Sequence, residues 1–261
     1  MGVLWLPILI VLVTYLLFAY LILPALWKHH EHHPALSAAP KYTVTGQGIP
    51  GDPLNVGFVG TQNEILCCLI AAGWHPADPI TFRSASQIVE SVLFRKPDPT
   101  APVSSLYLWG RQQDLAFERE VGSSARQRHH VRLWQAPQEY GVEDRSTWIG
   151  ATTFDVGVGI SHRTGQITHH ISADLDAERN TLISDARNTQ QVMKIYQVTG
   201  IGATLSGRNG GGDNYYTDGE MTIAVLTKGN QLKEGPPEKL PSPPAVTIKN
   251  HVFSWVRKVK G

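Results

Sequence analysis

The sequence predicts an α+β fold: one mostly antiparallel sheet with helices packed on it, preceded by one N-terminal transmembrane helix. Three observations support this. Residues 2–27 are apolar and carry no charged side chain. Residues 104–120 and 126–135 fit the period of two of a strand, which places Leu106 and Leu108 on one face of the first and Val131 and Leu133 on one face of the second. Residues 61–73 and 174–187 instead repeat apolar side chains at helical spacing.

Composition excludes several classes of protein. The chain has 261 residues and a formal net charge of +1, so we expect no nucleic-acid partner. Its two cysteines, Cys67 and Cys68, are adjacent, which excludes a disulfide framework and a CxxC zinc motif. Both cysteines fall on the apolar pattern of a helix, so we expect buried, inert thiols.

Residues 1–27 are expected to be a transmembrane anchor. A span needs about 20 apolar residues, and this segment is long enough with some tilt. A cleaved signal peptide is the alternative, but it would need a basic start and an apolar core of about 7–15 residues. Lys28 follows the span directly, which by the positive-inside rule predicts a single-pass protein of the cell membrane with its domain in the cytoplasm.

Residues 28–53 are expected to be a linker. They begin with the run KHHEHH, which could bind metal by composition or could form a polar spacer at the membrane surface. Prolines and glycines then interrupt any helix, although KYTV at residues 41–44 could add a short strand. Beyond the linker, Thr61 and Glu64 form the capping box of a helix that ends at Gly73. A second helix is expected to begin at residue 84 or 86.

Residues 104–120 resume the strand pattern, which breaks at Gly110. Arg111 and Asp114 follow this break on an otherwise apolar background. Such a pair usually fixes a turn through charge-assisted hydrogen bonds. The functional alternative is that Arg111 faces an anionic group of a substrate.

Two histidine pairs, at residues 129–130 and 169–170, mark the best candidate for a site. The pleat of a strand places His130 and Arg132 on one face, and His170 on the polar face of its own strand. If the two strands are neighbours, these three side chains converge. Neutral imidazoles with a carboxylate from Asp155 suit zinc or another divalent transition metal.

Asp174 is a further metal candidate with a competing interpretation. It begins the helical run of residues 174–187, where an N-cap and acidic side chains in the first turn oppose the helix dipole. The sequence contains no HExxH and no GxSxG motif. The glycine-rich run at residues 207–220 lacks the end of a P-loop and predicts a long, mobile hairpin loop.

The C-terminal residues divide into a proline-rich spacer, 231–246, and a basic amphipathic tail, 247–261. In the tail, Ile248, Val252 and Trp255 stand at helical spacing before three basic residues. Such a helix suits an anionic membrane surface, so residues 247–260 could join residues 2–27 as contacts of the lipid bilayer. The alternative is a terminal helix that docks on the domain.

Several blocks of residues 52–187 resemble the LssY C-terminal domain family of bacteria: DPLNVGFVGT, AAGWHPADPIT, LYLWGRQQDLAFE, RQRHHVRLW, ATTFD and SHRTGQITHHISADLDAER. The resemblance implies that residues 54–230 form an α+β domain of this family. That family has no established activity, and it occurs both as membrane-anchored proteins and fused to integral membrane domains of the DedA and lipid-phosphatase types. The resemblance therefore implies no phosphatase mechanism and assigns no catalytic residue here.

Two functions follow as hypotheses. The first is a membrane-tethered binding or accessory module that acts on a partner or component of the bacterial cell envelope. The second is a metal-assisted hydrolase of a lipid or phosphoester. Its metal ligands would be His130 and His170 with Asp155 or Asp174, and Arg132 or Arg111 would hold an anion. We favour the first because the sequence has no recognised catalytic signature.

Overall fold

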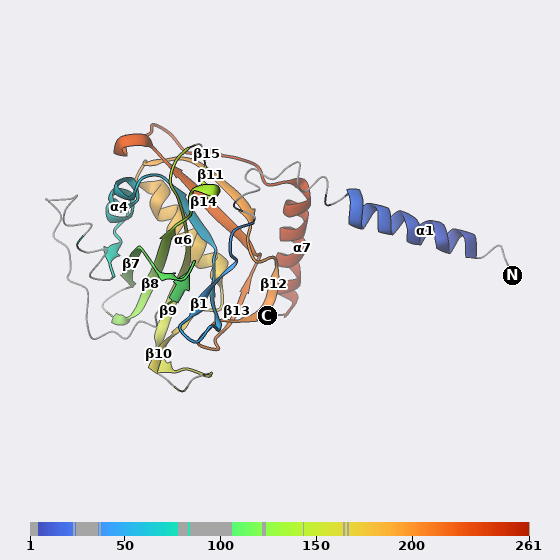
Figure 1. Ribbon diagram of the computed structural model, residues 1–261, viewed down its shortest axis with the longest axis horizontal. Coiled ribbons are helices and arrows are strands. Elements are labelled where there is room, and N and C mark those ends of the chain that lie inside the picture. Colours follow the sequence, from blue (N-terminus) through green and yellow to red (C-terminus); the bar gives the residue numbers. More distant parts are fainter. Residues whose placement is uncertain are drawn as a thin grey trace.

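A computed structural model describes residues 5–22, 24, 36, 38–77, 83, 106–121, 124–142, 144–163, 165 and 167–260 of the chain. The apolar N-terminal segment forms the helix α1 (Trp5–Leu17), which a π-helical turn, η1 (Phe18–Ile22), continues. Together they are long and apolar enough to cross a membrane, and none of their side chains is buried against the rest of the protein (Figure 1). The second helix expected from residue 84 or 86 and the histidine run at 28–33 lie outside the described residues.

A nine-stranded sheet forms the centre of the domain in the order β15-β11-β14-β3-β9-β8-β7-β4, with β10 paired to β9 (Figure 1). Neighbouring strands are antiparallel except for the pairs β3–β14 and β11–β15, which confirms the mostly antiparallel prediction. In chain order these strands are β3 (Val56–Val59), β4 (His75–Pro76), β7 (Leu115–Val121), β8 (Ser124–Gln135), β9 (Thr147–Ile160), β10 (Ile167–Ile171), β11 (Val192–Thr199), β14 (Glu220–Leu226) and β15 (Glu238–Lys239).

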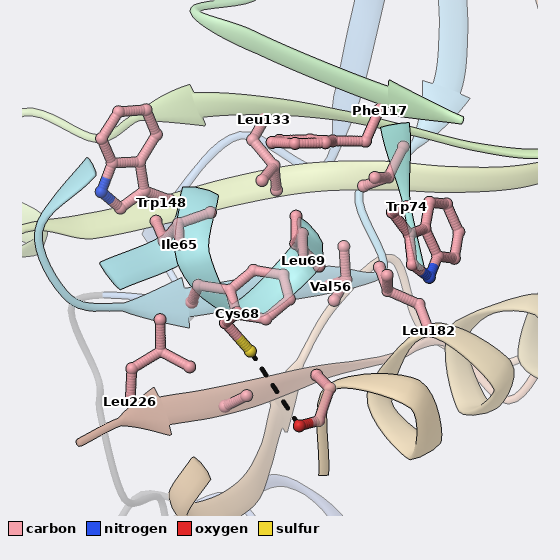
Figure 2. Close-up of a cluster of buried hydrophobic side chains, with 14 of the residues drawn as sticks. Val56, Ile65, Cys68, Leu69, Trp74, Phe117, Leu133, Trp148, Leu182 and Leu226 are labelled. Carbon is pink, nitrogen blue, oxygen red and sulfur yellow. Dashed lines mark hydrogen bonds between the residues drawn. The ribbon is translucent and has the colours of Figure 1, made fainter. Parts of the chain in front are cut away.

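Two helices, α4 (Gln62–Ala71) and α6 (Leu175–Asn188), cover one face of this sheet. The capping box of Thr61 and Glu64 begins α4 as the sequence predicts. Figure 2 shows the core between helices and sheet, where large apolar side chains from both layers interdigitate. Cys68 lies in this core with its Sγ 3.9 Å from the Ala186 carbonyl oxygen, and burial raises its pKa to about 11, consistent with an inert thiol.

A four-stranded sheet in the order β2-β1-β5-β6 packs on the other face. Its strands are β1 (Tyr42–Thr45), β2 (Pro50–Pro53), β5 (Leu106–Leu108) and β6 (Arg111–Gln112). Residues 42–53 were expected in the linker but form the β1–β2 hairpin. Gly48 at φ +79° allows its turn, and the prolines are tolerated because β2 is an edge strand that pairs on one side only.

The C-terminal third adds a hairpin and a helix. The expected loop at residues 207–220 is in fact part of a two-stranded sheet, β12 (Thr204–Arg208) and β13 (Asn214–Thr217). Within the expected spacer, β15 pairs with β11, and the helix α7 (Pro244–Lys260) then docks on the domain. Val246 and Phe253 are buried, and Lys249 forms an ion pair with Glu220.

Candidate functional site

A pocket of about 220 Å³ lies where β8, β9 and β10 meet the β1–β2 hairpin and the turn between β12 and β13. Its walls carry charged and titratable side chains from four separate parts of the chain: Asp52, Arg128, His130, Arg132, Asp155 and His169. The first five of these residues expose only 4–8% of their surface. Burying a charged side chain costs free energy unless it is paired with an opposite charge or hydrogen-bonded. We therefore expect these side chains to have polar partners.

The pleat of β8 brings three of these groups to one face. Arg128, His130 and Arg132 alternate along the strand and all line the pocket. The register of β8 with β9 sets Asp155 opposite Arg128, and the Arg128 Nε donates to Asp155 Oδ2 at 3.2 Å. His129 points to the opposite face, where its Nδ1 lies 2.8 Å from Glu178 of α6. The two members of this histidine pair therefore separate as the strand period predicts.

The second histidine pair differs from the expected arrangement. His169, and not His170, lines the pocket with His130. The His169 Nε2 lies 3.2 Å from Arg128 Nη2, and its Nδ1 lies 3.6 Å from Asp155 Oδ2. A bulge at this point of the β9–β10 pairing shifts the register between His170 and Ile171. The face on which each side chain lies therefore cannot be predicted by strict alternation through this region.

His170 joins a different group of side chains. Its Nδ1 lies 2.6 Å from Asp213 Oδ1, and its ring centroid lies 5.3 Å from that of His162. The structure therefore brings His130, Arg132 and Asp155 together as expected, but it separates His170 from them. We refer to His162, His170 and Asp213 below as the rim cluster.

Burial keeps both pocket imidazoles neutral. It lowers the pKa of His130 well below the ordinary value of 6.5, and the nearby Arg132 and Arg128 lower it further. Burial also lowers the pKa of His169, although Asp155 opposes the effect. A neutral imidazole offers one donor and one acceptor. Because Arg128 can only donate to His169 Nε2, the Nδ1 of this ring carries the proton and is the donor.

Two acidic side chains, Asp52 and Glu118, lie against the arginines. Burial raises the pKa of Asp52, whose carboxylate lies 3.7 Å from Arg132 and accepts a hydrogen bond from Asn209 at 3.2 Å. Burial likewise raises the pKa of Glu118, which accepts from Arg128 at 2.8 Å. A guanidinium group beside a carboxylate keeps further N–H donors, with which it can bind an anionic ligand.

His169 Nδ1 is a buried polar atom of a residue that lines the pocket. Within the part of the chain that the structure describes, His169 Nδ1 has no hydrogen-bond partner, because the Asp155 oxygen at 3.6 Å is too distant. Most buried polar atoms in folded proteins have such a partner. This atom therefore marks a place where a bound molecule would complete the site.

The other candidate residues lie away from the pocket. Arg111 forms an ion pair with Asp114 and donates to the carbonyl of Gln135, so the pair ties the β5–β6 turn to the end of β8. Asp174 is the N-cap of α6, where its side chain accepts from the Ala177 amide at 3.0 Å. Both positions fit the alternatives in which these residues stabilise a turn and a helix end.

The polar pocket residues that sequence reasoning missed include Asp52, Arg128, His169 and Asn209. Arg128 could have been found, because it has the same parity as His130 along one strand. Asp52 lies in the segment expected as a linker, and Asn209 lies in the expected loop. Nothing in the local pattern links either of them to β8.

A family model described as LssY C-terminus matches residues 36–221. The chain belongs to this family. No curated protein and no solved structure matches it. The LssY C-terminus match includes the whole pocket and the rim cluster, whereas α1 and α7 fall outside it.

Proposed function

We propose that this LssY C-terminus protein is a membrane-tethered binding module of the cell envelope, whose pocket holds a small polar ligand through an anionic group. The observation that carries the proposal is a pocket lined by two buried arginines and by His169, whose Nδ1 has no hydrogen bond within the described residues. A ligand oxygen that accepts from this nitrogen removes the cost of leaving it unsatisfied.

The arginines determine the chemical class of the ligand. A guanidinium group presents its donors in a planar fork that fits carboxylate and phosphate oxygens. Arg128 donates to Glu118 at 2.8 Å and to Asp155 at 3.2 Å, and Arg132 lies 3.7 Å from Asp52. Arg132, which lines the pocket beside His130, is the arginine on which we test the proposal.

Pocket size and the tether restrict the ligand further. Pockets for drug-sized ligands measure about 300–1,000 Å³. A volume of about 220 Å³ suits a headgroup or a small phosphorylated or carboxylated compound better than a whole lipid. Because α1 can hold the domain at a membrane, a phosphate-bearing headgroup and a free phosphorylated compound are both plausible sources of the anion. We place the domain on the cytoplasmic side, as Lys28 and the basic tail favour.

The test uses the full chain in detergent and isothermal titration with three probes: inorganic phosphate, glycerol 3-phosphate and acetate. We expect saturable binding of at least one probe, weakened about tenfold or more by Arg132→Lys, which keeps the charge but loses the fork. The matched control is Arg111→Lys, which changes an arginine outside the pocket. Vesicles with phosphatidic acid, compared with glycerol 3-phosphate, separate a lipid headgroup from a free ligand. No binding of any probe, or binding that Arg132→Lys leaves unchanged, would refute the proposal.

A second candidate is metal-assisted hydrolysis of a lipid or phosphoester, and the rim cluster favours it. Ser161 and Gly211, which line the pocket, are close in sequence to His162 and Asp213 of that cluster. A metal ion held there could polarise a phosphoester oxygen in the pocket. The test is phosphate release from phosphatidic acid with and without Zn²⁺ or Mn²⁺. Binding without turnover in every metal would leave the binding module as the function.

A further inference from the structure

We propose that His162, His170 and Asp213, the rim cluster, bind one divalent transition-metal ion. Each residue offers one ligand atom, and these three atoms all lie within 4.8 Å of one another. Ligands at zinc distances of about 2.0–2.2 Å in a tetrahedron lie about 3.3 Å apart. The cluster is therefore slightly open, and the exposed His162 side chain can close it without moving the buried Asp213.

The backbone around the cluster holds two of the ligands in place. Asp213 Oδ2 accepts from the Ile171 amide at 3.1 Å, which fixes the carboxylate beside His170. The Asp213 amide donates to Asn209 Oδ1 at 2.9 Å, so the turn between β12 and β13 is itself cross-linked. Such outer contacts orient metal ligands and are part of the affinity of a site.

The third ligand is brought in by contact between two turns. The His162 amide donates to the Gly211 carbonyl at 3.0 Å, and Ser161 Oγ donates to the same oxygen at 3.1 Å. Gly212 has φ +92°, and a Cβ at that position would lie 2.8 Å from the His162 Cβ. The turn after β9 thus packs directly on the turn after β12, which places His162 next to Asp213.

The alternative is a simple ion pair between His170 and Asp213, whose Nδ1 and Oδ1 lie 2.6 Å apart. That pair needs one imidazole only, whereas His162 brings a second to within ligand distance of the same carboxylate. Metal ligands must be deprotonated, so binding of the metal ion should weaken as the pH falls. Two imidazoles and one carboxylate suit Zn²⁺ or Co²⁺, and three protein ligands leave a coordination position for water or substrate.

This inference goes beyond the proposed binding function, since ligand binding at Arg132 and His169 requires no metal ion. The hydrolase candidate does depend on it. Failure of metal binding would therefore remove the hydrolase and leave the binding module to be judged by its own titration.

The experiment must exclude the N-terminal histidine run, which could bind metal by composition. We would use the full chain in detergent with His29, His30, His32 and His33 all changed to Asn. Titration with Co²⁺, followed by visible absorption, is expected to show that one ion binds per chain. The absorption bands should be those of Co²⁺ in a low-symmetry coordination, and Zn²⁺ should displace the bound Co²⁺. His162→Ala in this background should weaken binding at least about tenfold, since even outer contacts of a metal site are worth that much.

The control is His251→Ala, which removes another exposed imidazole, on α7, and should leave Co²⁺ binding unchanged. Because His162 is exposed, His162→Ala should unfold at the same temperature as its parent without metal. Zn²⁺ should raise the unfolding temperature of the parent and not that of the variant. Absence of stoichiometric Co²⁺ or Zn²⁺ binding, or binding that survives His162→Ala unchanged, would overturn the proposal.

Discussion

His169 and His170 are neighbours in one strand, yet they contact different carboxylates. The Nδ1 of His169 lies 3.6 Å from Asp155 in the pocket, and that of His170 lies 2.6 Å from Asp213 in the rim cluster. Successive side chains of a strand point to opposite faces, which accounts for this division. One short strand thus contributes to two adjacent sites that can be tested separately.

The first prediction is that substitutions at these neighbours have opposite effects. His169→Asn should weaken binding of the phosphate-bearing probes, inorganic phosphate and glycerol 3-phosphate. It should leave Co²⁺ binding unchanged, because His169 is not a ligand of the rim cluster. His170→Gln should weaken Co²⁺ binding and retain at least most of the binding of the probe. Both titrations use the chain without its N-terminal histidine run. If each variant loses both activities to the same extent, the two sites are not separate.

The second prediction concerns pH and His130. Burial lowers the pKa of His130, so below its ordinary value of 6.5 the unfolded chain takes up a proton that the folded chain does not. Stability should therefore fall as the pH decreases from 6.5, by up to about 1.4 kcal/mol per pH unit for this group. His130→Gln should flatten the pH dependence by that amount, measured by urea unfolding between about pH 7.5 and 5. A variant with the wild-type slope would contradict the burial argument.

The third prediction tests how closely β8 and β9 must approach. A Cβ on Gly150 would overlap the carbonyl oxygen of Arg132 and lie 2.6 Å from a methyl carbon of Leu133. Because backbone atoms cannot yield as a flexible side chain can, Gly150→Ala should destabilise the fold by about 1–3 kcal/mol. It should also weaken binding of the phosphate-bearing probe, since Arg132 would be displaced.

A matched control for this substitution exists in the same strand. A Cβ on Gly157 of β9 would meet nothing within 4 Å, so Gly157→Ala should change the free energy of unfolding by no more than about 0.5 kcal/mol. Equal effects of the two substitutions would show that close approach of the strands is not the reason.

The sequence predicts a structural element well where the residues that determine it lie close together in the chain. The capping box of Thr61 and Glu64 starts α4, and Asp174 starts α6, because a helix end depends on residues within one turn of it. His129 and His130 also point to opposite faces of β8, as alternation predicts. Except at its first residues, β8 pairs in regular antiparallel register with β7 on one side and β9 on the other.

The pocket could not be predicted because it depends on contacts between distant segments. Asp52 reaches Arg132 only because the β1–β2 hairpin packs on the second face of the large sheet. Asn209 and Asp213 arrive on a turn whose glycine-rich sequence carries no periodic signal. The bulge beside Ile171 reverses which histidine enters the pocket, and a bulge is a property of paired strands rather than of one strand.

The last prediction concerns α7, which docks on the domain through one face and exposes an apolar opposite face. Its inner face is docked, since Phe253 is buried and Arg257 stacks over Tyr216 with its guanidinium carbon 4.8 Å from the ring centroid. Its outer face presents an apolar stripe to solvent, with exposed fractions of 64% for Ile248, 56% for Val252 and 66% for Trp255. With basic residues at the end of the helix, this stripe suits the surface of an anionic membrane.

We therefore expect Trp255 to enter the interface of a bilayer that holds the full chain. In vesicles of anionic lipid with brominated acyl chains, tryptophan fluorescence should be quenched less in Trp255→Phe than in the wild type. The difference between the two isolates Trp255 from the tryptophans of the N-terminal segment. Lys258→Glu should reduce the quenching of Trp255 by repulsion from the anionic surface, and high salt should do the same. Equal quenching in wild type and Trp255→Phe would mean that α7 is a docked helix without a membrane contact.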